Sequence, residues 1–195
     1  QIMLEKEKFL NDKNIFCSSI FFFLLFPVKA DEKIKIIENF KKIQNLSFNF
    51  NQTVNGKTDR GSCKIQYPKK IYCSYKLRNN KILVSNGKSL VIKNNKNNQY
   101  YFYPLKSTPF ELLLDKSFIL REIKKSKINS VNDKYNYFLI KNSNYEINIF
   151  FDKNSHNLIG WQTEDIYQNL IVTFIFDLEI NSYINKKLFV LPSRN

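Results

Sequence analysis

The chain has 195 residues, 43% of them hydrophobic and 15% aromatic, which suffices for the core of one globular domain. Its formal net charge is +14, but the lysines are spread along polar segments without an arginine cluster or an aromatic stacking motif, so the composition does not favour a nucleic-acid-binding protein. A solvated, lysine-rich surface explains this charge, and attraction to anionic lipid surfaces is the alternative.

A mostly apolar run, Ile15–Val28, lies near the N-terminus and is followed by the small residue Ala30. It is shorter than the roughly 20 residues that a membrane-spanning helix needs, and Pro27 lies near its end. The run therefore resembles a secretory signal peptide, and we expect cleavage after Ala30. This interpretation removes residues 1–30 and leaves a single, still strongly basic domain over residues 31–195.

Cysteine and histidine residues are few. Cys63 and Cys73 lie in alternating segments on either side of Pro68, and a hairpin centred on this proline places them opposite each other. In an oxidising compartment this arrangement predicts a disulfide. His156 lies far away in a polar turn, so no tetrahedral metal site is expected, and no serine or cysteine has a recognisable base beside it in a motif. We therefore predict no catalytic residue, metal or cofactor.

Hydrophobic periodicity predicts two helical regions and a series of strands. Apolar residues recur at helical spacing over 31–46, which predicts one amphipathic helix. The triplet Ser107-Thr108-Pro109 offers a hydroxyl cap before an apolar helix at Phe110–Leu114, within a helical insertion from Thr108 to about Lys125. Turn signals such as Asn86-Gly87 divide the remainder into an antiparallel meander. About eleven strands are expected, at 46–54, 61–67, 71–77, 81–85, 88–93, 99–103, 126–131, 135–141, 145–151, 157–164 and 169–177.

Several late strands are apolar on both faces. In Leu170–Phe176 the even positions are all apolar, yet Ile171 and Ile175 are apolar as well, and Tyr135–Ile140 behaves similarly. A sheet with one face in water would alternate more strictly. The two predicted helical regions are the elements with apolar sides to offer, so we expect a curved sheet that they cover.

An ordered set of segments resembles the LolA family of periplasmic lipoprotein carriers over nearly all of residues 31–195. The segments are FNFNQTV at 48–54, GSCKIQYPKKIYCSY at 61–75, ILVSNGK at 82–88, TPFELLL at 108–114, LIGWQTEDIYQN at 158–169 and INKKLFVLP at 184–192.

The resemblance implies a mainly β fold: an incomplete, unclosed antiparallel β-barrel of about 11 strands, covered by a lid of α-helices. The apolar cavity inside would hold the acyl chains of lipoproteins on their way from the inner to the outer membrane. The partners implied are acylated lipoproteins, an inner-membrane lipoprotein-releasing ABC transporter and, if present, an outer-membrane receptor, for a periplasmic monomer. Candidate cavity residues are Phe48, Phe50, Leu90, Ile92, Phe110, Leu113, Leu114, Trp161, Val172 and Phe174.

One position departs from the family pattern. Many members carry arginine just before the proline of the second hairpin, where it latches the lid, whereas this chain has Tyr67. A phenol offers one hydrogen-bond donor and a guanidinium five, so a weaker latch is expected.

Two other function classes remain open. An envelope sensor or lipid-binding interaction domain of the same fold is the main alternative, although a sensor would usually carry a further domain or a membrane anchor. An enzyme that acts on lipids is the third, but it lacks a candidate nucleophile. The neighbouring acids Glu164 and Asp165 point to opposite faces of a predicted strand, so they are not expected to act together as an acid/base pair and are expected to be solvated. Of the three function classes we therefore expect the carrier.

Overall fold

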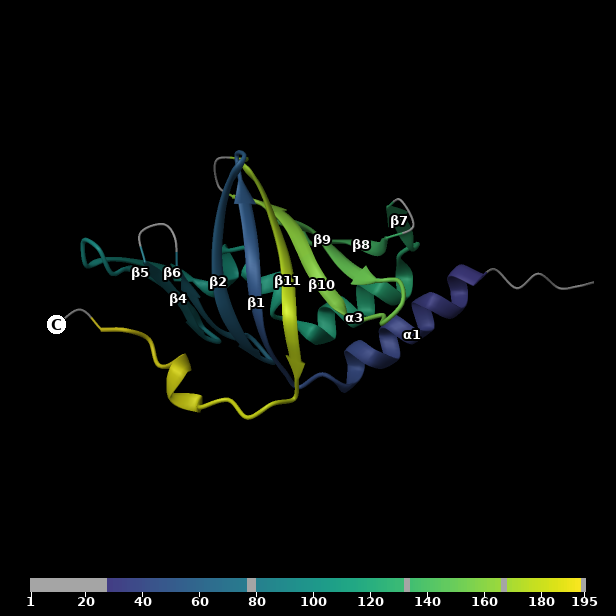
Figure 1. Ribbon diagram of the computed structural model, residues 1–195, viewed down its shortest axis with the longest axis horizontal. Helices are drawn as coiled ribbons and strands as arrows, with labels where there is room; N and C mark the ends of the chain where they lie inside the picture. The colour runs from purple at the N-terminus through teal and green to yellow at the C-terminus, as the bar shows by residue number, and fades with distance from the viewer. Residues whose placement is uncertain (1–27, 77–79, 132–133, 166–167, 194–195) are drawn as a thin grey trace, which may run out of the picture.

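The computed structural model describes residues 28–76, 80–131, 134–165 and 168–193. They form one antiparallel sheet of 11 strands in the order β6-β5-β4-β3-β2-β1-β11-β10-β9-β8-β7. The sheet does not close, because β6 and β7 remain its two edges. In Figure 1, β1 and β11 stand in front of α3, with β4–β6 on one side and β8–β10 on the other. The predicted unclosed barrel with a few helices is confirmed.

The strands follow most of the predicted turn signals, with shifted ends, but the residues Asp59-Arg60-Gly61, which the sequence indicates as a turn, lie within a strand. The strands are β1 Asn45–Val54, β2 Lys57–Gln66, β3 Lys70–Tyr75, β4 Lys81–Asn86, β5 Ser89–Asn94, β6 Gln99–Pro104, β7 Asn129–Val131, β8 Tyr135–Lys141, β9 Glu146–Asp152, β10 Leu158–Glu164 and β11 Leu170–Ile180.

The largest shift is in β2, which begins at Lys57 rather than at the predicted residue 61. The turn residues Asn55 and Gly56 have positive φ angles of 48° and 70°, so β2 turns back immediately and pairs with the end of β1. Among the described strands, neighbours in sequence pair with each other except β6 and β7, and a long-range pairing between β1 and β11 joins the two halves of the sheet.

The first helix, α1 (Val28–Lys42), is shorter at its C-terminal end than the predicted 31–46. Asn181 stops it: its side-chain oxygen accepts hydrogen bonds from the backbone N–H groups of Gln44 and Asn45, and its amide donates to the carbonyl of Lys42. These contacts satisfy groups that a helix end leaves unpaired. Of the predicted signal peptide, only the backbone of residues 28–30 lies within the described residues, as the first turn of α1.

In place of one helix from Thr108 to about Lys125 the structure has three short elements, the first of which precedes Thr108. They are η1 (Leu105–Ser107), α2 (Phe110–Leu113) and α3 (Lys116–Lys125). Asp115 separates α2 from α3 because its carboxylate accepts a hydrogen bond from the N–H of Phe118, 2.9 Å away, and so caps α3. The Thr108 hydroxyl donates to the carbonyl of Leu105 at 2.8 Å instead of capping α2 as predicted. We call residues 105–125 the lid. A last short helix, η2 (Lys186–Phe189), follows β11.

Aromatic side chains from the sheet and from α1 fill the core. Phe40 of α1 packs edge-on against Phe151 of β9, which in turn meets Phe138 of β8, with ring centroids 5.8 and 5.9 Å apart. All three are almost fully buried. Across the described residues no helix is long and apolar enough to cross a membrane.

The β2–β3 hairpin pairs Cys63 with Cys73. Their sulfur atoms are bonded at 1.96 Å, and both side chains are buried. The disulfide expected from the hairpin register is therefore present in the structure, on the hairpin whose turn reaches the lid.

Candidate binding cavity and its lid

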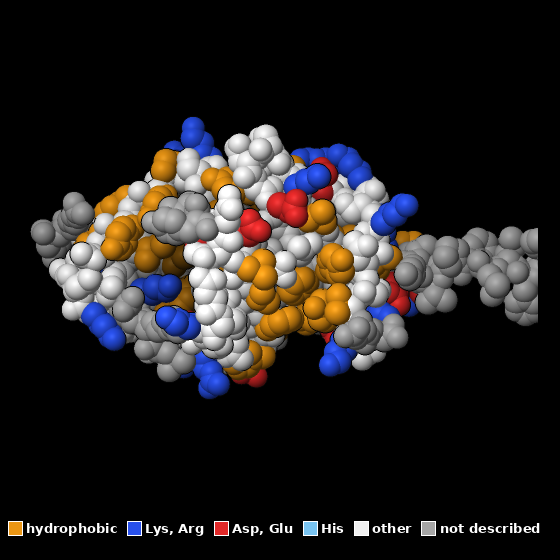
Figure 2. All heavy atoms as spheres, turned by 90° about the horizontal axis from the view of Figure 1, so that it is seen from above, with side chains coloured by type: hydrophobic (Ala, Val, Ile, Leu, Met, Phe, Trp, Pro, Cys, Tyr) orange, Lys and Arg blue, Asp and Glu red, His pale blue; other side chains and the backbone are white. Residues whose placement is uncertain are grey.

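A cavity of about 330 Å³ lies between the sheet and the first part of the lid. Its walls are mostly apolar and come from strands in both halves of the sheet. The lining residues are Gln52, Tyr75, Lys81, Leu83, Leu90, Ile92, Tyr103, Ser107, Thr108, Pro109, Phe110, Leu113, Ile147, Trp161, Thr163, Glu164, Asp165 and Ile171. Figure 2 shows hydrophobic side chains inside a hollow in the half of the molecule that carries β4–β6, with Lys or Arg side chains at its edge.

Several predicted cavity residues line this space. Leu90 and Ile92 come from β5, Phe110 and Leu113 from α2, and Trp161 from β10. Because α2 brings two of them over the sheet, the lid forms a wall of the cavity rather than only its rim.

Other predicted residues lie in the core behind the wall. The Phe48 ring packs edge-on against Trp161 with centroids 6.1 Å apart, and Phe50 packs in the same way against Tyr75 at 4.9 Å. Leu114 is fully buried. These side chains support the lining residues but do not themselves line the cavity.

Val172 and Phe174 were predicted on the wrong face of β11. Ile171 lines the cavity, and Thr173 and Ile175 are buried, so the odd positions face inward. Phe174 is 40% exposed on the opposite face, where its ring stacks on Phe150 with centroids 5.6 Å apart. Alternation could not decide the face because both faces of this strand are apolar.

Further lining residues were missed in the sequence. Leu83 lies between Cys73 and Ile92 in successive strand pairs, so all three share one face of the sheet. The predicted disulfide and the two turn signals would together have placed Leu83 beside Ile92. Ile147 and Ile171 had no comparable signal, because their strands are apolar on both faces.

A few polar side chains also line the cavity or support its wall. The Lys81 ammonium lies 4.2 Å from the centre of the Tyr75 ring. Burial raises the pKa of the Tyr75 phenol, so this ring is neutral at physiological pH. Gln52 donates a hydrogen bond to the Thr173 hydroxyl at 3.0 Å. Among the described residues no cluster of His, Cys, Asp and Glu could hold a metal ion.

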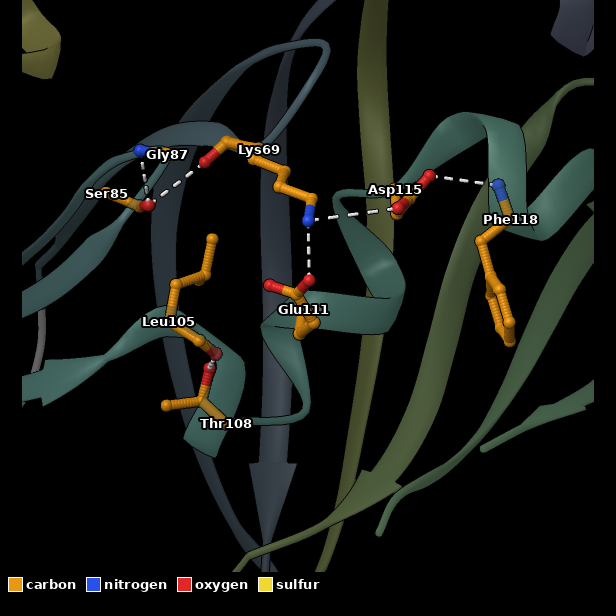
Figure 3. Close-up of polar contacts among 8 residues, drawn as sticks. All are labelled: Lys69, Ser85, Gly87, Leu105, Thr108, Glu111, Asp115 and Phe118. Carbon is orange, nitrogen blue, oxygen red and sulfur yellow. Dashed lines mark hydrogen bonds and ion pairs between the residues drawn. The ribbon is translucent and has the colours of Figure 1, made fainter. Parts of the chain in front are cut away.

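The turn of the β2–β3 hairpin holds the lid through Lys69 (Figure 3). Its backbone N–H donates to the Leu114 carbonyl at 3.0 Å, and its ammonium lies 2.5 Å from a Glu111 oxygen and 3.9 Å from an Asp115 oxygen. The Lys69 carbonyl accepts a hydrogen bond from the Ser85 hydroxyl of β4. The hydrogen bond to Glu111 raises the pKa of Lys69. One residue therefore connects the sheet to α2 and to the start of α3.

A second set of contacts joins α1 to the lid. The Lys116 ammonium donates to the carbonyls of Lys41 and Ile43, and partial burial lowers its pKa. At the other end of α3, the Lys33 ammonium donates to the carbonyls of Lys124 and Ser126, both at 2.7 Å. The two helices are thus tied at both ends.

The sequence also matches a known protein family over most of its length. The model of the family described as "Outer membrane lipoprotein carrier protein LolA" matches residues 41–192. The chain belongs to the LolA family. No curated protein sequence matches it significantly.

Solved structures of the same fold are distant in sequence. An uncharacterized conserved protein from Thermus thermophilus gives a TM-score of 0.50 at 8% identity, covering 84% of this chain and 94% of that one. A LolA superfamily protein from Nitrosomonas europaea gives a TM-score of 0.45 at 7% identity, covering 84% of this chain and 97% of that one. The MucA/MucB complex of Pseudomonas aeruginosa gives 0.45 at 10% identity, covering 85% of this chain and 61% of that chain. These similarities concern the fold alone.

Tyr67, at the latch position of the LolA family, makes no hydrogen bond to the lid. Its hydroxyl is buried and has no hydrogen-bond partner among the described residues. The ring instead packs edge-on against Phe40 of α1 with centroids 6.0 Å apart. Burial raises the pKa of the phenol. The expected weak hydrogen bond is therefore absent, and the polar contact to the lid comes from Lys69, two residues further on.

We predict that Lys69→Met loosens the lid. The substitution keeps the length and the backbone hydrogen bond but removes both ion pairs, whose partly exposed geometry contributes about 0.2–1 kcal/mol each. Amide hydrogen exchange over residues 105–125 should accelerate by about twofold to tenfold, with little change in β1 and β11.

Tyr67→Phe is the matched control for this prediction. It removes a buried hydroxyl without a partner, so exchange in the lid should stay the same or slow slightly. Faster exchange in Tyr67→Phe than in Lys69→Met would reverse the roles of the two residues. The raised pKa of Lys69 also sets the direction of the pH dependence. The ion pair persists below the ordinary lysine pKa and is lost as the pH rises through the raised pKa. The difference between wild type and Lys69→Met should therefore disappear in strong alkali.

Proposed function

We propose that the chain is a periplasmic carrier that binds the acyl chains of lipoproteins in the cavity and moves them from the inner to the outer membrane. The supporting observation is a mostly apolar cavity with one wall, α2, on a segment held to the sheet by a few polar contacts. Export with removal of residues 1–30, release of cargo from an inner-membrane ABC transporter and delivery to an outer-membrane receptor belong to the same proposal.

The size of the cavity supports a lid that moves. Its volume of about 330 Å³ lies near the lower end of the roughly 300–1,000 Å³ found for small-molecule pockets. Several acyl chains need more room than one drug-sized ligand. Because α2 is a single turn followed by a capped break at Asp115, it can move outward without disturbing the strand ladder.

Binding of lipopeptides that differ in acyl-chain length tests the proposal. Each buried methylene contributes about 0.8 kcal/mol, so shortening every bound chain by two methylenes should weaken binding by about fifteenfold for each chain that is fully buried. The deacylated peptide should not bind measurably.

Salt separates this mode from attraction to the basic surface. Burial of acyl chains is nearly indifferent to moderate salt, whereas binding through exposed charges weakens as ions screen it. Affinity measured by fluorescence titration should therefore persist in about 0.5 M salt, a concentration at which the Debye length is only about 4 Å. Equal binding of acylated and deacylated peptides, lost together on adding salt, would contradict the carrier.

A further inference from the structure

A second hollow adjoins the cavity at its rim. It has a volume of about 600 Å³ and lies around the β8–β9 turn and the neighbouring ends of β10 and β11. Pro109, Thr163, Glu164 and Asp165 line both hollows. We call the second hollow the polar groove; its lining residues are Pro109, Lys141, Asn142, Ser143, Asn144, Tyr145, Glu146, Asn148, Gln162, Thr163, Glu164, Asp165 and Leu170.

Side chains along the polar groove have unused hydrogen-bonding capacity. Asn148 and Gln162 face each other on neighbouring strands, β9 and β10, on the face of the sheet opposite to the cavity-lining Ile147 and Trp161, so the polar groove passes around the ends of these strands. Within the described residues neither their side-chain amides nor the carboxylates of Glu146 and Glu164 make a hydrogen bond or an ion pair. A side-chain amide both donates and accepts, which matches the alternating N–H and C=O groups of a peptide backbone.

The charge of the polar groove is opposite to that of the protein. Glu146, Glu164 and Asp165 line it against a single basic residue, Lys141, in a chain of net charge +14. At physiological ionic strength the Debye length is about 8 Å, so a bound segment responds mainly to these nearby charges. The groove therefore favours cationic over acidic side chains.

We propose that the polar groove holds the polypeptide segment that directly follows the acylated residue of the cargo, and that it prefers a segment containing Lys or Arg. This inference rests on the proposed carrier function. Acyl chains in the cavity place the polar end of the lipid-modified residue at the rim, and the four shared residues lead from there into the groove. A few extended residues at about 3.3 Å each reach along it.

The test uses three lipopeptides with identical triacylated cysteine and serine residues, followed by four lysines, four glutamines or four glutamates. Wild-type protein should bind the lysine form about threefold to tenfold more tightly than the glutamate form, because each exposed charge pair contributes a small amount. In the double variant Glu146→Gln/Glu164→Gln this preference, measured as the ratio of the affinities for the lysine and glutamate forms, should largely disappear.

The matched control is Glu38→Gln/Glu179→Gln, which changes the net charge equally on α1 and at the far end of β11. This variant should keep the preference for lysine. A photoreactive residue at the third position of the peptide should also crosslink to residues 141–148 or 162–165, as mapped by mass spectrometry.

The outcomes separate this inference from the carrier function. Equal affinity for the three lipopeptides in the wild type, or equal loss of the preference in both double variants, overturns the groove site while acyl-chain binding stands. Crosslinking confined to other strands overturns it as well. Failure of every acylated peptide to bind overturns the carrier function, and the groove inference with it.

Discussion

Leu113→Asp should abolish uptake of a triacylated lipopeptide. Leu113 is 2% exposed and lines the cavity from α2, so a carboxylate at this position faces both the apolar wall and any bound acyl chain. An unpaired charge in such surroundings costs several kcal/mol, and the affinity should fall by at least about a hundredfold. Fluorescence titration gives the affinity, and far-ultraviolet circular dichroism shows whether the sheet persists.

Two further variants keep this prediction decisive if Leu113→Asp unfolds the lid. Ile92→Trp fills the cavity from β5 without adding a charge. It should weaken the binding of lipopeptides with long acyl chains more than the binding of those with short ones. Val190→Asp, which places the same carboxylate on a residue that is 70% exposed, should bind like wild type. Undiminished uptake by both Leu113→Asp and Ile92→Trp would show that acyl chains bind elsewhere.

The strand pattern could be predicted because turn chemistry is local. Asn55-Gly56 and Asn86-Gly87 occupy backbone conformations with positive φ at the glycine, and strands pair across both. The first residues of β2 were not predicted because Asp59-Arg60-Gly61 is typical of a turn and the residues before it are polar. Pairing with β1, which lies outside any local pattern, extends the strand through them.

The inward face of a strand is a tertiary property. On β1 the even positions alone are apolar, so Phe48 and Phe50 were placed inside correctly. On β11 an aromatic cluster covers the outer face, where the Phe174 ring stacks on Phe150 and Gly160 lies opposite Phe174 in the ladder. These rings cover Gly160, which has no side chain. The apolar residues on the outer face of β11 therefore pack in this aromatic cluster, whereas those on the inner face belong to the core and the cavity wall.

The lid contact was predicted at the correct hairpin, but its hydrogen bond and ion pairs come from Lys69, whereas Tyr67 meets the lid through its ring, whose centre lies 5.9 Å from the Lys116 ammonium. Tyr67 stands at the position of the family arginine, but its hydroxyl is buried without a partner among the described residues. Lys69 has a φ angle of 66°, and this turn conformation presents both its N–H and its side chain to the lid. A charge run such as Lys69-Lys70 is usually solvated, so composition alone could not distinguish the lysine that pairs with Glu111 and Asp115.

Reduction of the disulfide between Cys63 and Cys73 should lower the free energy of unfolding by roughly 2–3 kcal/mol, because the bond restricts the unfolded chain over a short loop. The midpoint of unfolding in urea should therefore fall by about 1 M or more, because the free energy of unfolding of small proteins decreases by about 1–3 kcal/mol per molar urea. Wild type in the presence and absence of reductant has identical side chains, so the comparison isolates the bond.

The same reduction should also act on the lid, because the bond lies in the hairpin whose turn carries Lys69. Looser β2–β3 pairing moves the Lys69 N–H and ammonium relative to Leu114 and Glu111, so exchange over residues 105–125 should accelerate beyond that of the strands β8–β10. Cys63→Ala/Cys73→Ala, measured with and without reductant, is the control and should show no response to it. A wild-type midpoint that reductant leaves unchanged, with both thiols shown by labelling to be free, would mean that the bond does not stabilise this hairpin.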